Sequence, residues 1–235
     1  MPHARKCLNF KNKDMWYLVG LITTDGNLSL DGRHIDITSK HRNFLEKLRK
    51  ILGLKNKIGI KHSGSSTRHY YHFQISNRNF YEFLLLIGLT PRKSLTLGEL
   101  KIPAEWFSDF VRGVIDGDGC IRRWIHPSNK GEQWSLRIYS ASPVFIHWLK
   151  RKVEEHFLAK GQIHYNSMSV SVLKYGKLAA KRILGCCYYD GCLGLDRKTS
   201  MARLCGASDS GWSRSKTVMY AAQVAEVAEQ QTLWT

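Results

Sequence analysis

The chain has 235 residues, 43% of them hydrophobic, which is enough for one large folded domain or two small ones and too much for a disordered protein. Its 36 lysines and arginines against 19 aspartates and glutamates give a formal charge of +17 at pH 7. This excess is spread along the chain and attracts polyanions, of which nucleic acid is the first candidate and an anionic membrane surface the second. No apolar run approaches the ~20 residues of a membrane-spanning helix.

The N-terminal arm and the cysteines indicate the compartment. Residues 1–13 are basic but lack the apolar segment of a secretory signal. The six cysteines include no CxxC pair, so neither a zinc site nor a disulfide framework is expected. We therefore expect reduced thiols in an intracellular, cytosol-like compartment, either bacterial or archaeal cytoplasm or an organelle matrix.

After this arm, the pattern predicts an apolar helix and then a β-hairpin. The helix begins near Trp16 and ends at the dipeptide Asp25-Gly26, and the hairpin turns at Asp31-Gly32. Apolar and polar residues alternate along both strands, which predicts one buried and one exposed face. The apolar face is expected to hold Leu28, Leu30, Ile35 and Ile37, and the polar face Asn27, Ser29, His34 and Asp36.

The rest of the first half adds a helix, a second hairpin and another helix. Apolar residues at helical spacing predict a helix over 41–52 that stops at Gly53. Strands are predicted over 57–63 and 70–76, and a helix over 80–87.

The second half repeats this order of elements. Strands are predicted over 120–126 and 134–139, then a helix over 143–157 with proline at its first position, strands over 162–166 and 169–173, and a closing helix over 177–186. Each half is therefore αββαββα, and the fold class is α+β. We divide the chain into the N-terminal arm, a first half over 14–100, a second half over 101–205, and a tail over 206–235 of unknown role.

The two predicted apolar helices carry the same motif. The segments 18–26 and 111–119 share the form apolar-x-Gly-apolar-Ile-x-x-Asp-Gly, so Gly20 matches Gly113 and Asp25 matches Asp118. Because glycine in a helix interior costs ~1 kcal/mol relative to alanine, the matched glycines indicate a close crossing of the two helices. That crossing would bring both aspartates together, where they repel unless a cation lies between them. Hard oxygen ligands of this kind suit Mg²⁺.

These segments resemble the paired LAGLIDADG motifs of single-chain homing endonucleases, and the resemblance covers residues 14–205. It implies a pseudo-two-fold saddle of two antiparallel sheets in the DNA major groove, with the motif helices at the interface. It also implies a monomeric, intron-encoded endonuclease in which divalent metal ions, Mg²⁺ or another, serve the hydrolysis of one phosphodiester per strand without an organic cofactor. Since the halves differ in detail, the double-stranded DNA target should be asymmetric.

The same resemblance assigns site residues, and some positions depart from the family pattern. Metal binding is implied for Asp25 and Asp118 with the preceding Thr24 and Gly117, catalysis for the basic residues Lys93 and Lys198, and a backup role for their neighbours Arg92 and Arg197. Thr23 stands where many relatives carry an acid, and Asp116 is expected to cap or pair locally. Ser39 and Ser140 occupy the place of a water-orienting glutamine, which leaves water positioning open.

The polar strand faces are expected to contact DNA as a set. In the first half this set is Asn27, Ser29, Arg33, His34, Asp36, Lys61, Arg68, His72 and Gln74. In the second half it is Arg122, Trp124, His126, Arg137, Tyr139, His164, Asn166 and Ser169.

Two further functions remain open at this stage. The chain could be an intron maturase or another RNA-binding relative, or a DNA-binding regulator that no longer cleaves. Retention of both aspartates favours the enzyme, whereas RNA binding without DNA cleavage would favour the maturase.

Overall fold

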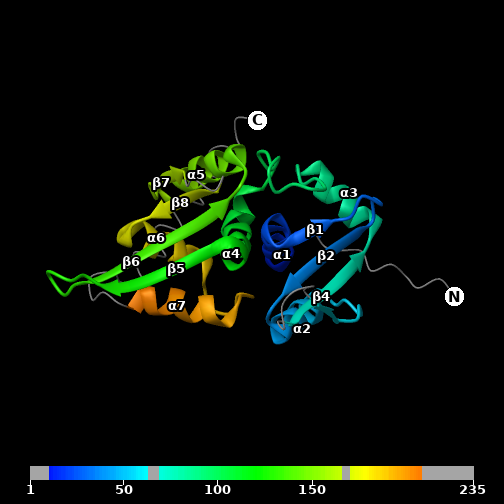
Figure 1. Ribbon diagram of the computed structural model, residues 1–235, viewed down its shortest axis with the longest axis horizontal. Coiled ribbons are helices and arrows are strands. Elements are labelled where there is room, and N and C mark those ends of the chain that lie inside the picture. Colours follow the sequence, from blue (N-terminus) through cyan, green and yellow to red (C-terminus); the bar gives the residue numbers. More distant parts are fainter. Residues whose placement is uncertain (1–10, 63–68, 166–169, 208–235) are drawn as a thin grey trace.

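The computed structural model describes residues 11–62, 69–165 and 170–207, and it consists of two similar halves (Figure 1). Each half contains one four-stranded antiparallel sheet, with strand orders β1-β2-β4-β3 and β5-β6-β8-β7. The first half is α1 (Lys13–Thr24), β1 (Gly26–Leu28), β2 (His34–Ser39), α2 (Arg42–Ile51), β3 (Gly59–His62), β4 (His69–Ser76) and α3 (Arg78–Leu86). The second half is η1 (Ala104–Trp106), α4 (Phe107–Asp118), β5 (Gly119–Ile125), β6 (Glu132–Ser140), α5 (Pro143–Phe157), β7 (Gln162–Tyr165), β8 (Ser171–Tyr175), α6 (Lys177–Cys187) and α7 (Asp196–Ala207).

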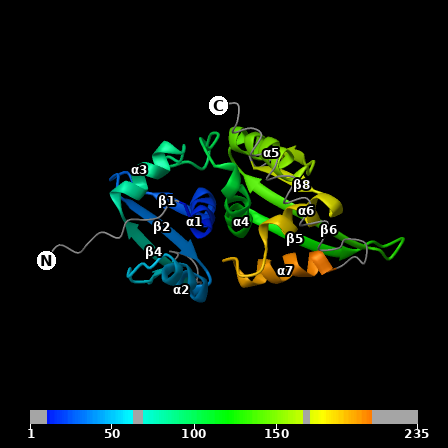
Figure 2. The same ribbon diagram turned by 180° about the vertical axis from the view of Figure 1, so that it is seen from behind.

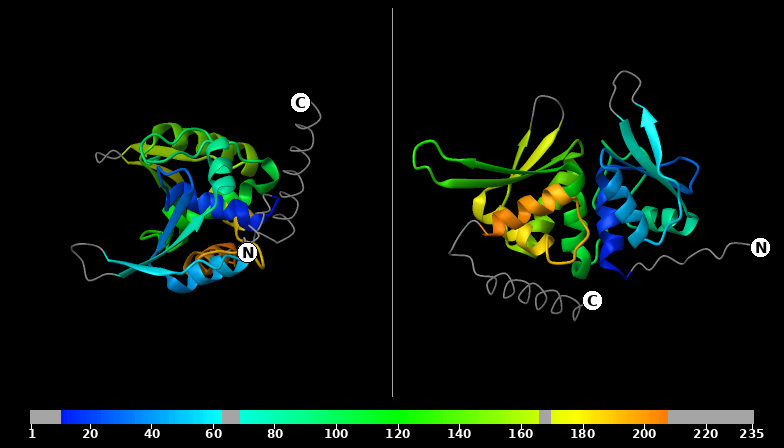
Figure 3. Two further views of the ribbon diagram at one scale, coloured as in Figure 1. Left: turned by 90° about the vertical axis from the view of Figure 1, so that its right-hand side faces the viewer. Right: turned by 90° about the horizontal axis from the view of Figure 1, so that it is seen from below.

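This architecture confirms the α+β class and the duplicated αββαββα order. The two sheets lie on one side of the molecule, and the helices pack against the other side of the sheets (Figure 3). Predicted helices and strands begin and end within about two residues of the observed ones, apart from the parts of predicted strands at residues 63, 166 and 169, which lie outside the described residues. No helix in the described part of the chain is both long and apolar enough to cross a membrane.

Two features differ from the sequence expectation. Leu30 does not belong to the buried strand face, because β1 ends at Leu28 and the Leu30 side chain is 69% exposed in the turn. Helix α7 was not predicted, because its residues lack an apolar stripe at helical spacing. It packs against α6 and contains Lys198. The predicted tail lies outside the described residues except for Gly206 and Ala207, which end α7.

Helices α1 and α4 pack side by side at the centre, where their glycines meet (Figures 1 and 2). A Cβ added to Gly20 would lie 2.1 Å from the carbonyl oxygen of Phe110, and one added to Gly113 would lie 2.2 Å from that of Tyr17. Any side chain larger than hydrogen would therefore push the two backbones apart. The close crossing determines where both helices end, and so where Asp25 and Asp118 lie.

A buried polar network crosses the same interface. Asp116 accepts hydrogen bonds from the hydroxyls of Tyr17 (2.7 Å) and Tyr188 (2.6 Å) and from the backbone N–H of Leu195 (2.8 Å). Asp116 therefore joins α1, α4, α6 and the segment before α7, rather than pairing locally as expected. These bonds leave both of its carboxylate oxygens occupied by protein donors, so Asp116 is a structural residue.

Candidate active site at the ends of the two central helices

Asp25 and Asp118 lie at the C-terminal ends of the two crossing helices. Asp25 caps α1, with its N–H donating to the carbonyl of Leu21 at 2.8 Å, and Asp118 is the last residue of α4. The helix ends approach so closely that a Cβ on Gly117 would lie 1.9 Å from Oγ1 of Thr24 and 3.4 Å from Oδ2 of Asp25. Only glycine fits at position 117 in this arrangement.

The electrostatic environment of the two aspartates shows that they interact. Both side chains are exposed, yet surrounding protein removes enough water to raise their pKa values. For Asp25, this desolvation and the negative charge of Asp118 together raise the pKa to about 6. Two carboxylates that disfavour each other's charge are a place where a cation would be stabilised.

Each aspartate is accompanied by a buried lysine from another part of the chain. Lys93 follows α3 in a turn and is 7% exposed, and its ammonium donates to the carbonyl of Gly26. Lys198 lies in α7 and is 3% exposed, and its ammonium donates to the carbonyls of Ile115 (2.5 Å) and Asp116 (2.6 Å). The lysines thus bind the backbone where the central helices end, and they are not mobile surface side chains.

The two lysines interact electrostatically with both aspartates. Burial lowers the pKa of Lys93 to about 8 and also lowers that of Lys198. Of the two site aspartates, Asp118 opposes this effect more strongly at Lys93, whereas Asp25 does so more strongly at Lys198. At both aspartates, in turn, Lys198 lowers the pKa more than Lys93 does. The two lysines and the two carboxylates therefore form one cluster rather than separate pairs, an arrangement that the sequence order does not indicate.

A small cavity of about 130 Å³ adjoins this centre on one side. It lies between Thr24 and Lys93 of the first half and Asp118, Tyr139 and Ser140 of the second. Tyr139 was predicted to contact DNA, and here it lies beside the candidate catalytic residues. The cavity gives solvent access to Asp118 and Lys93 at the seam between the two halves.

The other predicted site residues have local partners. The Thr24 hydroxyl bonds its own helix, donating to the carbonyl of Leu21 at 3.1 Å or of Gly20 at 3.3 Å. The Gly117 carbonyl accepts from Lys198 at 3.3 Å. The hydroxyls of Ser39 and Ser140 each accept from a backbone N–H two residues later, at 3.1 Å. Arg92 and Arg197 are exposed beside the two buried lysines.

Most of the predicted DNA-contacting residues that the structure describes lie on the sheet face opposite the helices, which we call the outer face. In the first sheet, Asp36 lies between Asn27 and Gln74 on neighbouring strands, and His72 is 3.6 Å from it. Arg33 precedes β2 and lines a hollow beside α3, so the register does not place it on this face. Ser29 and His126 follow β1 and β5, Lys61 is on the edge strand β3, and Arg68, Asn166 and Ser169 lie outside the described residues.

In the second sheet, the register places Arg122 opposite Ser135, and Trp124 opposite Gln133. Arg137 lies between Cys120 and Lys174 on the neighbouring strands. Val172 on β8 lies between Tyr139 on β6 and His164 on β7, so all three side chains are on the same face. The strand pairing also brings to the outer face polar residues that sequence reasoning missed, among them Thr38, Gln133, Gln162 and Lys174. The alternation along each strand could have identified them, since they share the phase of the predicted set.

Comparison with known proteins adds a family to this geometry. The family described as LAGLIDADG-like domain matches residues 12–88. The match ends before the second motif, so the relation of the second half to LAGLIDADG proteins rests on its repeated fold. Comparison with curated protein sequences yields no match.

Solved structures share the LAGLIDADG fold over most of the chain. Full-length DUF199/WhiA from Thermatoga maritima is 14% identical, with a TM-score of 0.53 over 96% of this chain and 72% of that one. Mesophilic variants of the homing endonuclease I-DmoI are 17% identical, with a TM-score of 0.52 over 82% and 97%. The homing endonuclease I-WcaI bound to its DNA recognition sequence is 10% identical, with a TM-score of 0.58 over 79% and 88%. At these identities the LAGLIDADG fold is shared, and the residues at the site must be judged individually.

Proposed function

We propose that this protein is a site-specific double-strand DNA endonuclease that acts as a monomer on a long asymmetric target. The observation that carries the proposal is the electrostatic coupling of Asp25 and Asp118 at the ends of two crossing helices, each with a buried lysine beside it. A structural pair of helix caps would have no need of two mutually repelling carboxylates. The formal charge of +17 supports a polyanionic substrate.

The donor set at the helix ends fits a hard divalent cation. Two carboxylates and the Thr24 carbonyl supply oxygen ligands from three residues, and Mg²⁺ commonly completes its shell with water and substrate phosphate. I-DmoI, whose fold this chain shares at 18% identity and a TM-score of 0.53, has been crystallised with DNA and Ca. When bound, such a metal would activate water and neutralise charge on the leaving oxygen of a phosphodiester.

The residues at the helix ends, the two lysines and the two sheets would each have a separate role in cleavage. Asp25 and Asp118 would hold a divalent cation at the ends of the two central helices. Lys93 and Lys198 place ammonium groups where negative charge develops on the phosphate, and their lowered pKa values make proton donation to a leaving oxygen easier. The outer faces of the two sheets read base edges and hold phosphates on either side of the centre.

A DNA-binding protein that does not cleave is the second candidate, and two observations favour it. Among the described residues no group of three His, Cys, Asp or Glu side chains could hold a metal. Lys198 also occupies the Gly117 carbonyl, which was a predicted metal ligand. This candidate keeps the saddle and the basic surface and loses only the chemistry.

The deciding experiment is selection of cleaved sites from a randomised DNA duplex library with Mg²⁺. The parent should release discrete double-strand products, and Asp25→Asn and Asp118→Asn should yield nicks or no product. The matched control is Asp190→Asn, because Asp190 is exposed and paired only with Arg203 at 3.6 Å, far along the chain from both motifs. If the parent binds a defined duplex in gel-shift assays and never cuts it, the non-cleaving candidate is correct. Preferred binding to RNA instead would favour the maturase.

A further inference from the structure

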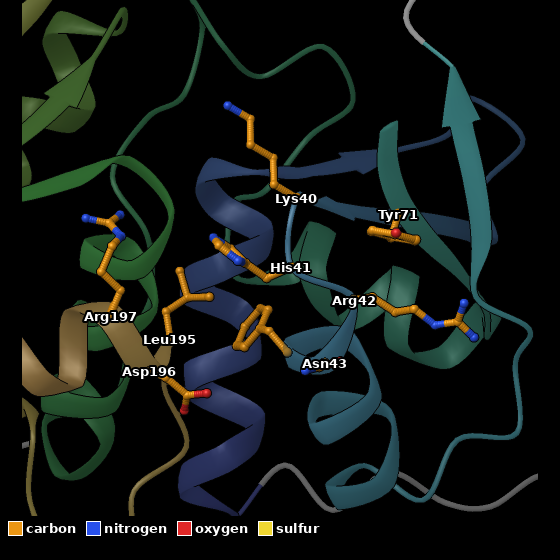
Figure 4. Close-up of a pocket in the computed structure, with 9 residues that line it drawn as sticks. Lys40, His41, Arg42, Asn43, Tyr71, Leu195, Asp196 and Arg197 are labelled. Atoms are coloured by element: carbon orange, nitrogen blue, oxygen red, sulfur yellow. The ribbon is translucent and has the colours of Figure 1, made fainter. Parts of the chain in front are cut away.

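A large basic hollow separates the start of α2 from the start of α7, to one side of the candidate active site (Figure 4). Its volume is about 500 Å³. It is lined by Lys40, His41 and Arg42 from the first half and by Leu195, Asp196 and Arg197 from the second, among others. Asp196 is the one acid among the described lining residues, and it is paired with Lys47 at 2.7 Å. The hollow therefore carries net positive charge.

Two of its cations are available to an external anion. Figure 4 shows Lys40 and Arg197 pointing in the same direction, toward the end of α1 that leads into β1, while Arg42 points away. Arg42 is paired with Glu46 at 2.9 Å. Within the described part of the chain, the nearest partner of Lys40 is the ring of Tyr70 at 5.6 Å, and Arg197 forms no ion pair with an acid.

The internal repeat provides a comparison for this hollow. Because α2 begins at Arg42 and α5 begins at Pro143, the stretch Lys40-His41-Arg42 corresponds to Ala141-Ser142-Pro143 in the second half. This stretch of the second copy is uncharged, and of the two cations only Arg197 has a counterpart in the repeat, the exposed Arg92. Since the same turn forms in both halves, the fold does not require the cations of the first copy.

The helix starts differ in the same sense. In the second half, the Ser142 hydroxyl accepts a hydrogen bond from the N–H of Phe145 at 3.4 Å and so caps α5. In the first half, His41 stands at the equivalent position and makes no side-chain cap to α2. The first N–H groups of α2 therefore remain open to an acceptor at the hollow, which adds to the attraction of Lys40 and Arg197 for an anion.

We propose that this hollow binds one backbone phosphate of the DNA through Lys40 and Arg197, and that the equivalent place at the start of α5, which has Arg92 but only uncharged residues at 141–143, binds the equivalent phosphate more weakly. The proposal rests on the proposed function for the identity of the ligand, since DNA is the polyanion that would cross this surface. It means that, near the cleavage site, the protein binds the two DNA strands with unequal strength. The strand that passes over α2 is bound more tightly than the strand that passes over α5.

The test uses a DNA duplex recovered from a random library by repeated binding in Ca²⁺, so that it does not depend on cleavage. Neutral methylphosphonates then replace single phosphates on each strand in turn. For the full-length parent, one substitution on one strand should weaken binding about tenfold beyond its neighbours. In the variants Lys40→Gln and Arg197→Gln, the methylphosphonate at that position should not weaken binding further, because the side chain that binds the phosphate is already absent. The slope of binding affinity against salt concentration should also fall by about one per lost phosphate contact.

The matched control is Lys50→Gln on the same helix, since Lys50 is exposed at its far end and outside the hollow. It should leave the methylphosphonate profile unchanged. Equal sensitivity at symmetric phosphates of both strands, or a profile that Lys40→Gln and Arg197→Gln do not alter, would overturn the inference. A parent that binds and shows the one-sided profile but never cuts would overturn the proposed activity alone. A parent that selects no duplex would overturn both.

Discussion

The hydroxyl of Tyr17 on α1 donates a hydrogen bond of 2.7 Å to Oδ2 of Asp116 on α4, although the two residues are 99 positions apart in the sequence. Tyr188 donates to the other carboxylate oxygen at 2.6 Å, so the two tyrosines hold Asp116 from opposite halves. Thr23 stands at the matching position of the first motif and only bonds its own helix, through the carbonyl of Val19. The pseudo-two-fold repeat is therefore broken at its centre. The second motif supplies the acidic residue that forms hydrogen bonds across the interface, and the first motif does not.

Tyr17→Phe should lower the free energy of unfolding by about 1–3 kcal/mol, because it removes one of the three donors to a buried carboxylate. The measurement is urea unfolding followed by far-UV circular dichroism. Tyr165→Phe is the control, since the Tyr165 hydroxyl bonds His147 on the exposed surface and its loss should change stability by less than about 0.5 kcal/mol. Equal effects of the two variants would mean that Asp116 does not depend on Tyr17.

Gly20→Ala should destabilise the protein by about 1–3 kcal/mol or more, because the new Cβ meets the Phe110 carbonyl at 2.1 Å. Gly206→Ala is the matched control within a helix. No atom lies within 4 Å of its added Cβ, so it should be neutral or stabilise α7 by up to about 1 kcal/mol. Thermal unfolding of both variants distinguishes crowding from helix propensity. A stable Gly20→Ala variant would show that α1 and α4 can separate without cost.

Asp25→Asn should stabilise the metal-free protein at pH 7.5 and have no such effect at pH 4. The pKa of Asp25 is about 6 in the folded protein against 3.8 for the free side chain, so folding favours the protonated form. The stability that this provides is present below about pH 4 and is lost as the pH rises through 6. Thermal unfolding in EDTA across this range measures it, with Asp190→Asn as the flat control. Added Mg²⁺ should then stabilise the parent and not Asp25→Asn. A pH-independent difference would contradict the raised pKa of Asp25.

Lys198→Met should cost more stability than Lys93→Met. Lys198 bonds three carbonyls at the end of α4, whereas Lys93 bonds the carbonyl of Gly26. Leaving buried carbonyls without a donor costs about 1–3 kcal/mol, so urea unfolding should rank the variants in this order. Both should lose cleavage of the selected duplex. If a variant loses stability but keeps full cleavage activity, the lysine that it replaces has a structural role and no role in cleavage.

Much of the fold follows from local patterns in the chain. Period-two alternation predicted the strands, apolar residues at helical spacing predicted α2 and α5, and the matched glycines predicted the close crossing of α1 and α4, since each signal reflects nearby residues that share one face. The failures were also local. Leu30 was placed in a strand because alternation continues past the point where the turn begins, and α7 was missed because it has almost no apolar stripe.

What the sequence determined by itself is the repeat, the α+β order of elements and the two Asp-Gly dipeptides at the helix ends, because these depend on spacing along one chain. The tertiary structure alone decided how the two halves combine. It brought Lys93 and Lys198 near both Asp25 and Asp118, joined Tyr17 to Asp116, and placed Lys40 and Arg197 around one hollow. Each of these pairs joins residues far apart in sequence through the packing of one half against the other, and no periodicity within either half encodes that packing.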